Sequence, residues 1–415
     1  MAGRIHIIGA GLAGLSAAVR LSSQGRVVNV YESASYAGGR CRSFHDANLD
    51  RVIDNGNHLL LSGNRAALAF LREIGAADSV TGPSPAVFPF LDLDGGLRWQ
   101  VKPDRGAIPW SILSAWRRVP GSRLRDYLWG LQLARARATD SVTDCLGADN
   151  LLFRRFWKPL AVSVLNTAAE EGAARLLWPV IRETFGRGEA ACRPLIARHG
   201  LSDSFVTPAT AFLKRHGAPV AFNRRLRRLG FDGERLTTLD FGDSQLEVQD
   251  GDSVILAVPP LIAAELVPGL ETPTDSRAIV NGHFCLAEEA QEISFCGLIG
   301  GTAQWLFIRG DIVSVTVSAA DDLAAQPTEL IAERLWSEVA TALDLGDAEL
   351  GPYRIVKEKR ATFAQTPEQV RRRPGARTRW CNLHLAGDWT DTGLPATIEG
   401  AIRSGHNVAQ SVIYL

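Results

Sequence analysis

Residues 3–43 read GRIHIIGAGLAGLSAAVRLSSQGRVVNVYESASYAGGRCRS, and this stretch decides the fold. A short apolar strand leads into a turn that contains Gly9, Gly11 and Gly14; a helix follows, and Gly25 ends it before a second strand. Strand, glycine turn, helix and strand in this order form a βαβ unit, whose GxGxxG turn is typical of dinucleotide binding. The sequence therefore predicts an α/β protein built on a Rossmann-type sheet.

Each glycine of this turn has its own physical role. Gly9 permits the tight turn, Gly11 lets the backbone approach a pyrophosphate, and Gly14 lets the helix pack closely on the strand. The helix N-terminus offers free N–H groups to phosphates. Glu32 ends the second strand, where a carboxylate accepts from ribose hydroxyls and disfavours a 2′-phosphate, so NADP is not expected. The predicted dinucleotide contacts of this unit are Gly9, Gly11, Leu12, Ala13, Gly14, Glu32 and Ser33, and the unit alone leaves NAD and FAD open.

A second glycine pair follows in YAGGRCRS, where Gly38 and Gly39 allow another close backbone approach and Arg40 can neutralise phosphates. A glycine turn with a solvated arginine is the alternative. The spacing from Glu32 to this GGR resembles the second dinucleotide motif of the flavin amine oxidase and carotenoid desaturase superfamily. That resemblance implies FAD as the cofactor. The segment YRIVKEKRATFAQTP contains no cysteine, so we expect the flavin to be bound non-covalently.

The resemblance extends to two later segments. Residues 383–410 predict a strand, a loop that contains Asp388, and a helix that starts near Thr397 and turns its N-terminus toward the flavin. The alternative interpretation of the same residues is an amphipathic core helix whose small residues serve packing. Residues 217–260 predict a β-meander and a buried strand that returns to the Rossmann sheet. The further FAD contacts implied are Gly38, Gly39, Arg40, Gly56, Asn57, His58, Leu226, Pro259, Gly387, Asp388, Thr397 and Ile398.

We therefore expect two domains, each assembled from separated segments. Residues 1–80, 205–260 and 354–415 would form the FAD-binding domain, and residues 81–204 and 261–353 an inserted α+β substrate domain. The insertions are rich in aromatic and aliphatic residues, which favours an apolar tunnel and a lipid substrate, although a plain hydrophobic core explains the same composition.

The overall composition bears on whether the protein binds nucleic acid, a membrane or a metal. Lys+Arg and Asp+Glu both number 45, so no global charge attracts nucleic acid. No apolar run reaches the roughly 18 residues of a transmembrane helix. The six cysteines show no metal-ligand spacing, so no metal is expected, and reduced thiols fit the cytoplasm. Residues 108–129 interleave tryptophans with arginines, which fits either contact with the inner face of the cytoplasmic membrane or a solvated helical face.

Three segments narrow the family: DNGNHLLLSGNRAALAFLREIG at 54–75, FWKPLAVSVLNT at 156–167 and LAGDWTDTGLPATIEGAIRSG at 385–405. Together they look like the squalene-associated FAD-dependent desaturases, the hydroxysqualene dehydroxylases of bacterial hopanoid biosynthesis. Asn57 stands where members often carry glutamine. The implied reaction is reduction of hydroxysqualene to squalene, by hydride from reduced flavin N5, with loss of water. The electron donor to the flavin is left unidentified.

The leaving hydroxyl needs a proton or a hydrogen-bond donor, and His58 is the first candidate. A histidine that bonds the flavin or the backbone is the alternative. Asp54 would orient His58 or cap the loop, Asn166 is either a polar site residue or a helix end, and Lys357 is either a flavin contact or a solvated side chain. The rival functions are a polyene desaturase, an amine oxidase, and a redox-neutral isomerase or lipid-binding flavoprotein.

Overall fold

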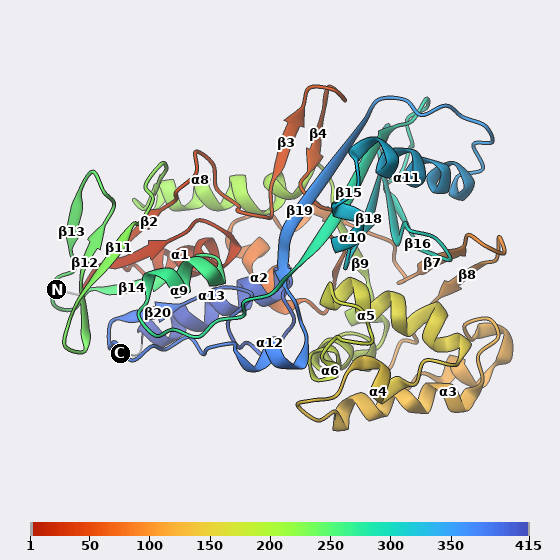
Figure 1. Cartoon of the computed structure of the whole chain (residues 1–415), viewed down its shortest axis with the longest axis horizontal. Helices are drawn as coiled ribbons and strands as arrows, with labels where there is room; N and C mark the ends of the chain where they lie inside the picture. Colours follow the sequence, from red (N-terminus) through yellow and green to blue (C-terminus); the bar gives the residue numbers. More distant parts are fainter. Residues whose placement is uncertain (1–2, 414–415) are drawn as a thin grey trace.

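A five-stranded parallel sheet forms the left half of the molecule (Figure 1). The computed structural model describes residues 3–413. Strand β1 (Ile5–Ile8) lies at the centre between β2 (Val28–Tyr31) and β14 (Ser253–Leu256). The outer strands are β10 (Val220–Ala221) and β20 (Leu383–Leu385). Strands from three distant parts of the chain thus complete one sheet, and the predicted Rossmann-type fold is confirmed.

Two long helices, α1 (Leu12–Ser23) and α13 (Ile398–Ile413), pack against each other on this sheet. Their contact depends on Gly405, because a Cβ there would collide with the Ser16 hydroxyl and the Ala13 carbonyl. The predicted end of the first helix is confirmed, since Gly25 follows it with φ +74°. The remaining helices of this half are α2 (Arg65–Glu73), α8 (Thr207–Arg215), α9 (Pro260–Leu266) and α12 (Pro367–Arg371).

The predicted meander is confirmed as a small antiparallel sheet of β11 (Arg228–Asp232), β12 (Arg235–Asp240) and β13 (Gln245–Glu247). The chain then enters β14 and returns to the main sheet, as expected.

A seven-stranded sheet dominates the right half (Figure 1). Its order is β19-β15-β18-β17-β16-β7-β8. The strands are β7 (Phe88–Asp92), β8 (Arg98–Val101), β15 (Ser276–Cys285), β16 (Ser294–Ile299), β17 (Trp305–Arg309), β18 (Ile312–Val317) and β19 (Tyr353–Phe363). The domain division remains a proposal; by strand pairing, β19 belongs with the substrate segments, so we propose that the third FAD segment begins after Phe363.

The two faces of this sheet differ in chemistry because successive side chains point to opposite sides. Val280, Phe284, Val313 and Val315 pack on the helices α10 (Asp321–Ala324) and α11 (Thr328–Ala342). The alternate positions carry polar and aromatic side chains toward the rest of the molecule. This second face forms part of the site described below.

Short elements join the halves. A hairpin of β3 (Ser43–Asp46) and β4 (Arg51–Asp54) leads into the loop 55–59, and β5 (Leu60–Leu61), β6 (Val80–Thr81) and β9 (Pro194–Ala197) pair beside it. The helices α3 (Leu124–Leu128), α4 (Val142–Leu146), α5 (Lys158–Leu165) and α6 (Ala174–Glu183) lie below the seven-stranded sheet in Figure 1, and the short helix α7 (Glu189–Cys192) follows α6 in the chain.

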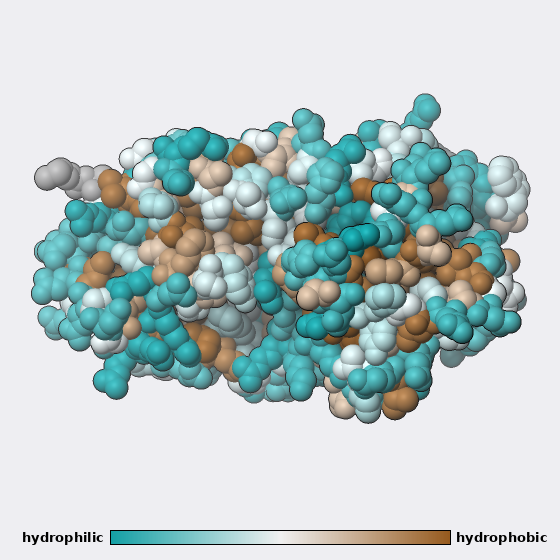
Figure 2. Space-filling view, turned by 90° about the horizontal axis from the view of Figure 1, so that it is seen from above, coloured by the Kyte–Doolittle hydropathy of each residue, from teal (hydrophilic) through white to brown (hydrophobic). Residues whose placement is uncertain are grey.

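The molecule is elongated, and the face turned upward in Figure 1 is largely hydrophilic, with hydrophobic residues in small separate groups (Figure 2). Among residues 3–413, no helix combines the length and the apolar character needed to cross a bilayer.

Candidate functional site

The turn between β1 and α1 has the shape of a phosphate cradle. Gly9 has φ +105°, and a Cβ on Gly14 would collide with the Gly9 carbonyl, so both positions require glycine. A Cβ on Gly11 would meet nothing within 4 Å, and no side chain caps the helix that starts at Leu12. The first amides of α1, including those of Leu12 and Ala13, are therefore free for a phosphate, and the residues present fit a dinucleotide.

Glu32 is fixed at the end of β2 by backbone amides. Its Oε2 accepts from the Ala10 amide at 2.8 Å, and its Oε1 accepts from the Ala34 amide at 2.9 Å and from the Ser33 hydroxyl at 3.1 Å. Because each carboxylate oxygen can accept two hydrogen bonds, Oε2 keeps a lone pair for a ribose hydroxyl. Glu32 also accepts the Arg224 amide through its backbone carbonyl, which places the segment that leads to Leu226 beside it.

The second glycine motif packs on the first. The Gly38 amide donates to the Ala10 carbonyl at 2.8 Å, and a Cβ on Gly39 would lie 3.5 Å from the Gly11 Cα. The two glycine motifs therefore lie side by side, so that a single ligand can contact both of them.

Arg40 and Asp388 form an ion pair in which Nη2 lies 2.8 Å from both carboxylate oxygens. The Asp388 carboxylate raises the pKa of the Arg40 guanidinium. The Asp388 side chain is 9% exposed and the Arg40 side chain 45% exposed. Both residues were predicted FAD contacts, but their pairing could not be read from positions 348 residues apart.

The C-terminal segment contains further predicted FAD contacts. The Gly387 amide donates to the Ser404 hydroxyl on α13, and the Thr397 hydroxyl accepts from the Gly400 amide at 3.1 Å, at the start of the helix that was predicted there. Pro259 precedes α9, and the neighbouring Val258 carbonyl accepts the Trp389 indole N–H at 2.9 Å.

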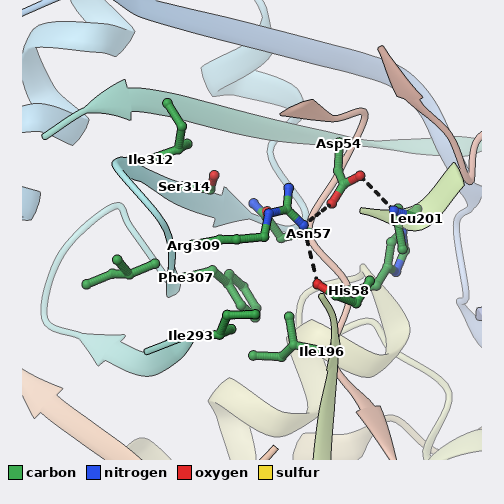
Figure 3. Close-up of a pocket in the computed structure, with 12 residues that line it drawn as sticks. Asp54, Asn57, His58, Ile196, Leu201, Ile293, Phe307, Arg309, Ile312 and Ser314 are labelled. Atoms are coloured by element: carbon green, nitrogen blue, oxygen red, sulfur yellow. Dashed lines mark hydrogen bonds and ion pairs between the residues drawn. The ribbon is translucent and has the colours of Figure 1, made fainter. Parts of the chain in front are cut away.

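Asp54 is buried and serves as a structural anchor. It accepts from the Ser43 hydroxyl at 2.6 Å, from the Leu201 amide at 2.9 Å and from Arg309 Nη1 at 3.0 Å. Figure 3 shows the carboxylate between Arg309 and Leu201. The structure therefore pairs Asp54 with Arg309, and no hydrogen bond joins it to His58 among the described residues, contrary to the orienting role considered above.

His58 lies deep in the protein, yet its side chain is accessible, because it faces a pocket. Burial lowers the pKa of His58, and the Asp54 charge opposes this only in part. The imidazole is therefore neutral near pH 7, with one N–H donor and one acceptor nitrogen.

The pocket beside His58 is small, with a cavity volume of about 20 Å³, and it has two chemically distinct sides (Figure 3). Its apolar side comes from Ile196, Leu201, Ile293, Phe307 and Ile312, and its polar side from Asp54, Asn57, His58, Arg309 and Ser314. Phe307 also belongs to a larger aromatic wall on the same sheet face, made of Phe88, Phe90, Trp99, Phe295, Trp305 and Phe307.

A polar ladder holds the loop that carries Gly56 and Asn57. Asn57 Nδ2 donates to the Thr316 hydroxyl at 3.1 Å, Thr316 donates to Asn281 Oδ1 at 2.8 Å, and Asn281 Nδ2 donates to the Asn55 carbonyl at 3.3 Å. Asn281 and Thr316 are cross-strand partners on β15 and β18. The sequence reasoning missed Asn281, Thr316 and Arg309; polar residues at alternate positions of otherwise apolar strands were the available signal.

Two further candidates lie outside this cluster. Lys357 donates to the Gln326 carbonyl, whereas its neighbour Glu358 points to the opposite side of β19 and accepts from Asn55 Nδ2 at 3.4 Å. The structure therefore does not bring Lys357 to the Arg40 and His58 side. Asn166 ends α5 with φ +45°, and its amide bonds Thr362 Oγ1 and the Ala319 amide, which confirms the helix-end alternative.

The sequence matches the family model of flavin-containing amine oxidoreductases over residues 12–288 and 303–413. Among curated proteins, the hydroxysqualene dehydroxylase of Rhodopseudomonas palustris is 46% identical over 100% of this chain and 99% of its own length. That of Sinorhizobium fredii is 47% identical over 98% of this chain and 97% of its own. The zeta-carotene desaturase of Synechocystis is 20% identical over 99% and 97%.

Solved structures share the fold at low sequence identity. Putrescine oxidase bound to putrescine has a TM-score of 0.71 at 16% identity and covers 100% of both chains. Cyclohexylamine oxidase from Brevibacterium oxydans has a TM-score of 0.68 at 14% identity, over 100% of this chain and 99% of that one. These likenesses establish the arrangement of the two halves and say nothing about the substrate.

Proposed function

Since the chain belongs to the flavin-containing amine oxidoreductase family, with FAD as its cofactor, we propose that it is a hydroxysqualene dehydroxylase. The reaction joins hydroxysqualene and reduced FAD to give squalene, oxidised FAD and water. The observation that carries the proposal is the 46–47% identity to two hydroxysqualene dehydroxylases over nearly the whole of each chain. The distant desaturase relative, at 20% identity, offers much weaker support for a polyene desaturase.

The cofactor contacts proposed for the chain follow the two glycine motifs. The amides at the start of α1 would bind the pyrophosphate, and Glu32 a ribose. The Arg40–Asp388 pair and the loop Gly56–His58 would hold the part of FAD nearer the flavin ring, which supplies a hydride when reduced.

The pocket and the aromatic wall suit an apolar allylic alcohol. Isoleucine and phenylalanine side chains exclude water, which protects developing positive charge on the allylic carbon from capture by solvent. The faces of Phe307 and Trp305 are electron-rich and would stabilise that charge by the same attraction that operates in cation–π contacts. A purely polar site would offer neither effect.

We propose that His58 assists departure of the hydroxyl group. A neutral imidazole can donate its N–H to the leaving oxygen, and the low pKa that burial gives it keeps it neutral near pH 7. Arg309 is a second donor at the pocket, held by Asp54. We assign Lys357 no part in this step, because its ammonium group is held on the other side of β19.

We also propose that the enzyme acts in the cytoplasm at the inner face of the cytoplasmic membrane, because its C30 hydrocarbon substrate and product partition into bilayers.

The test is a single-turnover experiment without oxygen. The flavin of the purified holoenzyme is reduced, hydroxysqualene is added, and flavin absorbance and squalene are followed together. Reoxidation of the flavin with one squalene formed per flavin supports the proposal. Flavin that stays reduced beside intact hydroxysqualene overturns it. His58→Ala should slow reoxidation more than it lowers the FAD content; wild-type rates would remove His58 from the mechanism.

A further inference from the structure

A short part of the chain carries half of the exposed large hydrophobic side chains. Of the sixteen such residues found within residues 3–413, eight lie between positions 108 and 131. Trp116 is the most exposed at 86%. We refer to these eight side chains and their neighbouring arginines as the tryptophan–arginine surface: Ile108, Trp110, Leu113, Trp116, Leu124, Leu128, Trp129 and Leu131, with Arg117, Arg123 and Arg125.

This surface is built on a well-packed base. Val119 and Leu133 are buried in the core of the helical region, and the Val119 amide donates to the Tyr127 hydroxyl at 3.0 Å. A Cβ on Gly130 would lie 2.9 Å from the Trp157 ring, so α3 and the turn after it sit directly on that indole. The apolar side chains therefore point outward from a fixed scaffold, which makes their exposure a property of the fold.

The charge of the segment is strongly one-sided. Residues 102–137 hold eight arginines and lysines against two aspartates, a net charge of +6 in a chain whose total is zero. Both aspartates have local partners: Asp126 accepts from the Arg123 amide at 2.7 Å, and Asp104 from the Ser111 amide at 2.9 Å. Arg125 Nε lies 4.0 Å from Asp126 and Arg117 Nη2 lies 3.9 Å from Asp104. The two arginine side chains are nevertheless 72% and 43% exposed, so their guanidinium groups keep contact with solvent.

We propose that the tryptophan–arginine surface binds the headgroup region of an anionic lipid bilayer. Tryptophan and leucine beside arginine suit the boundary between headgroups and acyl chains, where the apolar groups enter and the guanidinium groups bind phosphates. A second copy of this chain is a poor occupant, because two surfaces of charge +6 repel each other. The inference rests on the proposed function in one respect: a lipid-soluble substrate gives the enzyme a reason to reach the bilayer.

The surface is also connected to the aromatic wall of the substrate half. Arg155 donates to the Pro120 carbonyl at 2.9 Å, and its guanidinium lies 5.7 Å from the centre of the Trp99 ring. A Cβ on Gly188, just before α7, would lie 2.5 Å from the Gly106 carbonyl. A bilayer bound here would thus lie at the end of the molecule that holds the apolar cluster, away from the parallel FAD sheet (Figure 1).

The experiment is sedimentation of the FAD-loaded full chain with two kinds of vesicle, phosphatidylcholine alone and phosphatidylcholine with phosphatidylglycerol. We expect binding to the second kind that weakens as salt rises, since exposed charges are screened beyond about 10 Å in ~0.1 M salt. Arg117→Gln with Arg125→Gln should weaken binding by about fivefold for each arginine. Trp116→Ala should weaken binding to the same vesicles. Leu330→Ala, at a side chain 54% exposed on α11, is the matched control and should bind like wild type.

The outcomes separate this inference from the enzymatic proposal. If the wild-type protein binds neither kind of vesicle, the proposed docking surface is wrong, whatever the turnover of hydroxysqualene in detergent. Binding of the Trp116 and arginine variants to the anionic vesicles at the wild-type level would also overturn it. A wild-type dimer that binds no vesicle and that Trp116→Ala converts to a monomer would overturn it as well. Vesicle binding lost in these variants, with turnover in detergent retained, supports it. The same loss without any turnover of hydroxysqualene supports the surface and counts against the proposed reaction.

Discussion

Replacing Asp54 by asparagine tests whether this residue anchors the pocket or serves His58. The carboxylate receives hydrogen bonds from Ser43, Leu201 and Arg309. In Asp54→Asn one oxygen remains for Ser43 and Leu201, while the new amide N–H₂ would face the Arg309 guanidinium, a donor against a donor. The change thus removes one charge-assisted hydrogen bond and leaves the rest of the anchor in place.

The magnitude lies between two limits. Loss of a hydrogen bond to a charged group costs about 1.5–3 kcal/mol, and removal of one partner of a fully buried pair costs about 3–5 kcal/mol. Asp54 is buried, but the Arg309 side chain is 26% exposed at the pocket and can recruit water. We therefore expect a loss of about 2 kcal/mol of unfolding free energy, near the lower limit.

The assay is a double-mutant cycle of Asp54→Asn and Arg309→Gln, with urea unfolding of the FAD-loaded protein followed by circular dichroism. The two losses should be non-additive, with a coupling energy of about 1–2 kcal/mol. In Asp54→Asn the pKa of His58 should fall further, because the Asp54 charge that raises it is lost, and the pH profile of turnover should move to lower pH. Additive losses would refute the anchor, because they would show that Asp54 and Arg309 stabilise the protein independently.

Two further predictions concern charge at other positions. Asp388→Asn should weaken FAD retention, because it removes the charge that holds the Arg40 guanidinium; equal flavin content after gel filtration would contradict this. Burial lowers the pKa values of His283 and His384 from 6.5 to about 4, so the unfolded chain binds more protons between these values. Stability should be full above pH 6.5 and fall as the pH drops toward 4, which thermal unfolding across that range measures; a flat profile would contradict neutral, buried imidazoles.

The parts of the site that could be predicted from the sequence are the ones whose physics is local. Gly9 and Gly14 lie within one turn, and the backbone angle and close packing that require them arise from adjacent elements. The helix that starts at Ile398 was expected near Thr397 for the same reason. Such features depend on a few neighbouring residues, so a single sequence contains all the information they need.

The pairings that define the pocket are not local. Asp54 and Arg309 are separated by 255 positions. The role of Asn281 likewise depends on the position of β15 beside the loop at Gly56, which the sequence does not show. The proposed contact at Lys357 shows the same limit, because neighbouring side chains on a strand face opposite ways. Glu358, one position later, lies on the side of β19 that faces Asn55, where the prediction placed Lys357.

The loop 54–58 belongs in sequence to the FAD half but is held by the substrate half. Its first residue is bound by Arg309 of β17, and Asn55 and Asn57 are held by Asn281 of β15 and Thr316 of β18. Because these bonds are distributed over three neighbouring strands, the loop can move relative to the sheet only if several break together. The proposed hydride transfer to an allylic carbon demands a fixed distance between flavin and substrate. The polar ladder ties the loop of the proposed cofactor site to the sheet on the other side of the pocket and would fix that distance, which gives a reason for polar side chains in strands that are otherwise apolar.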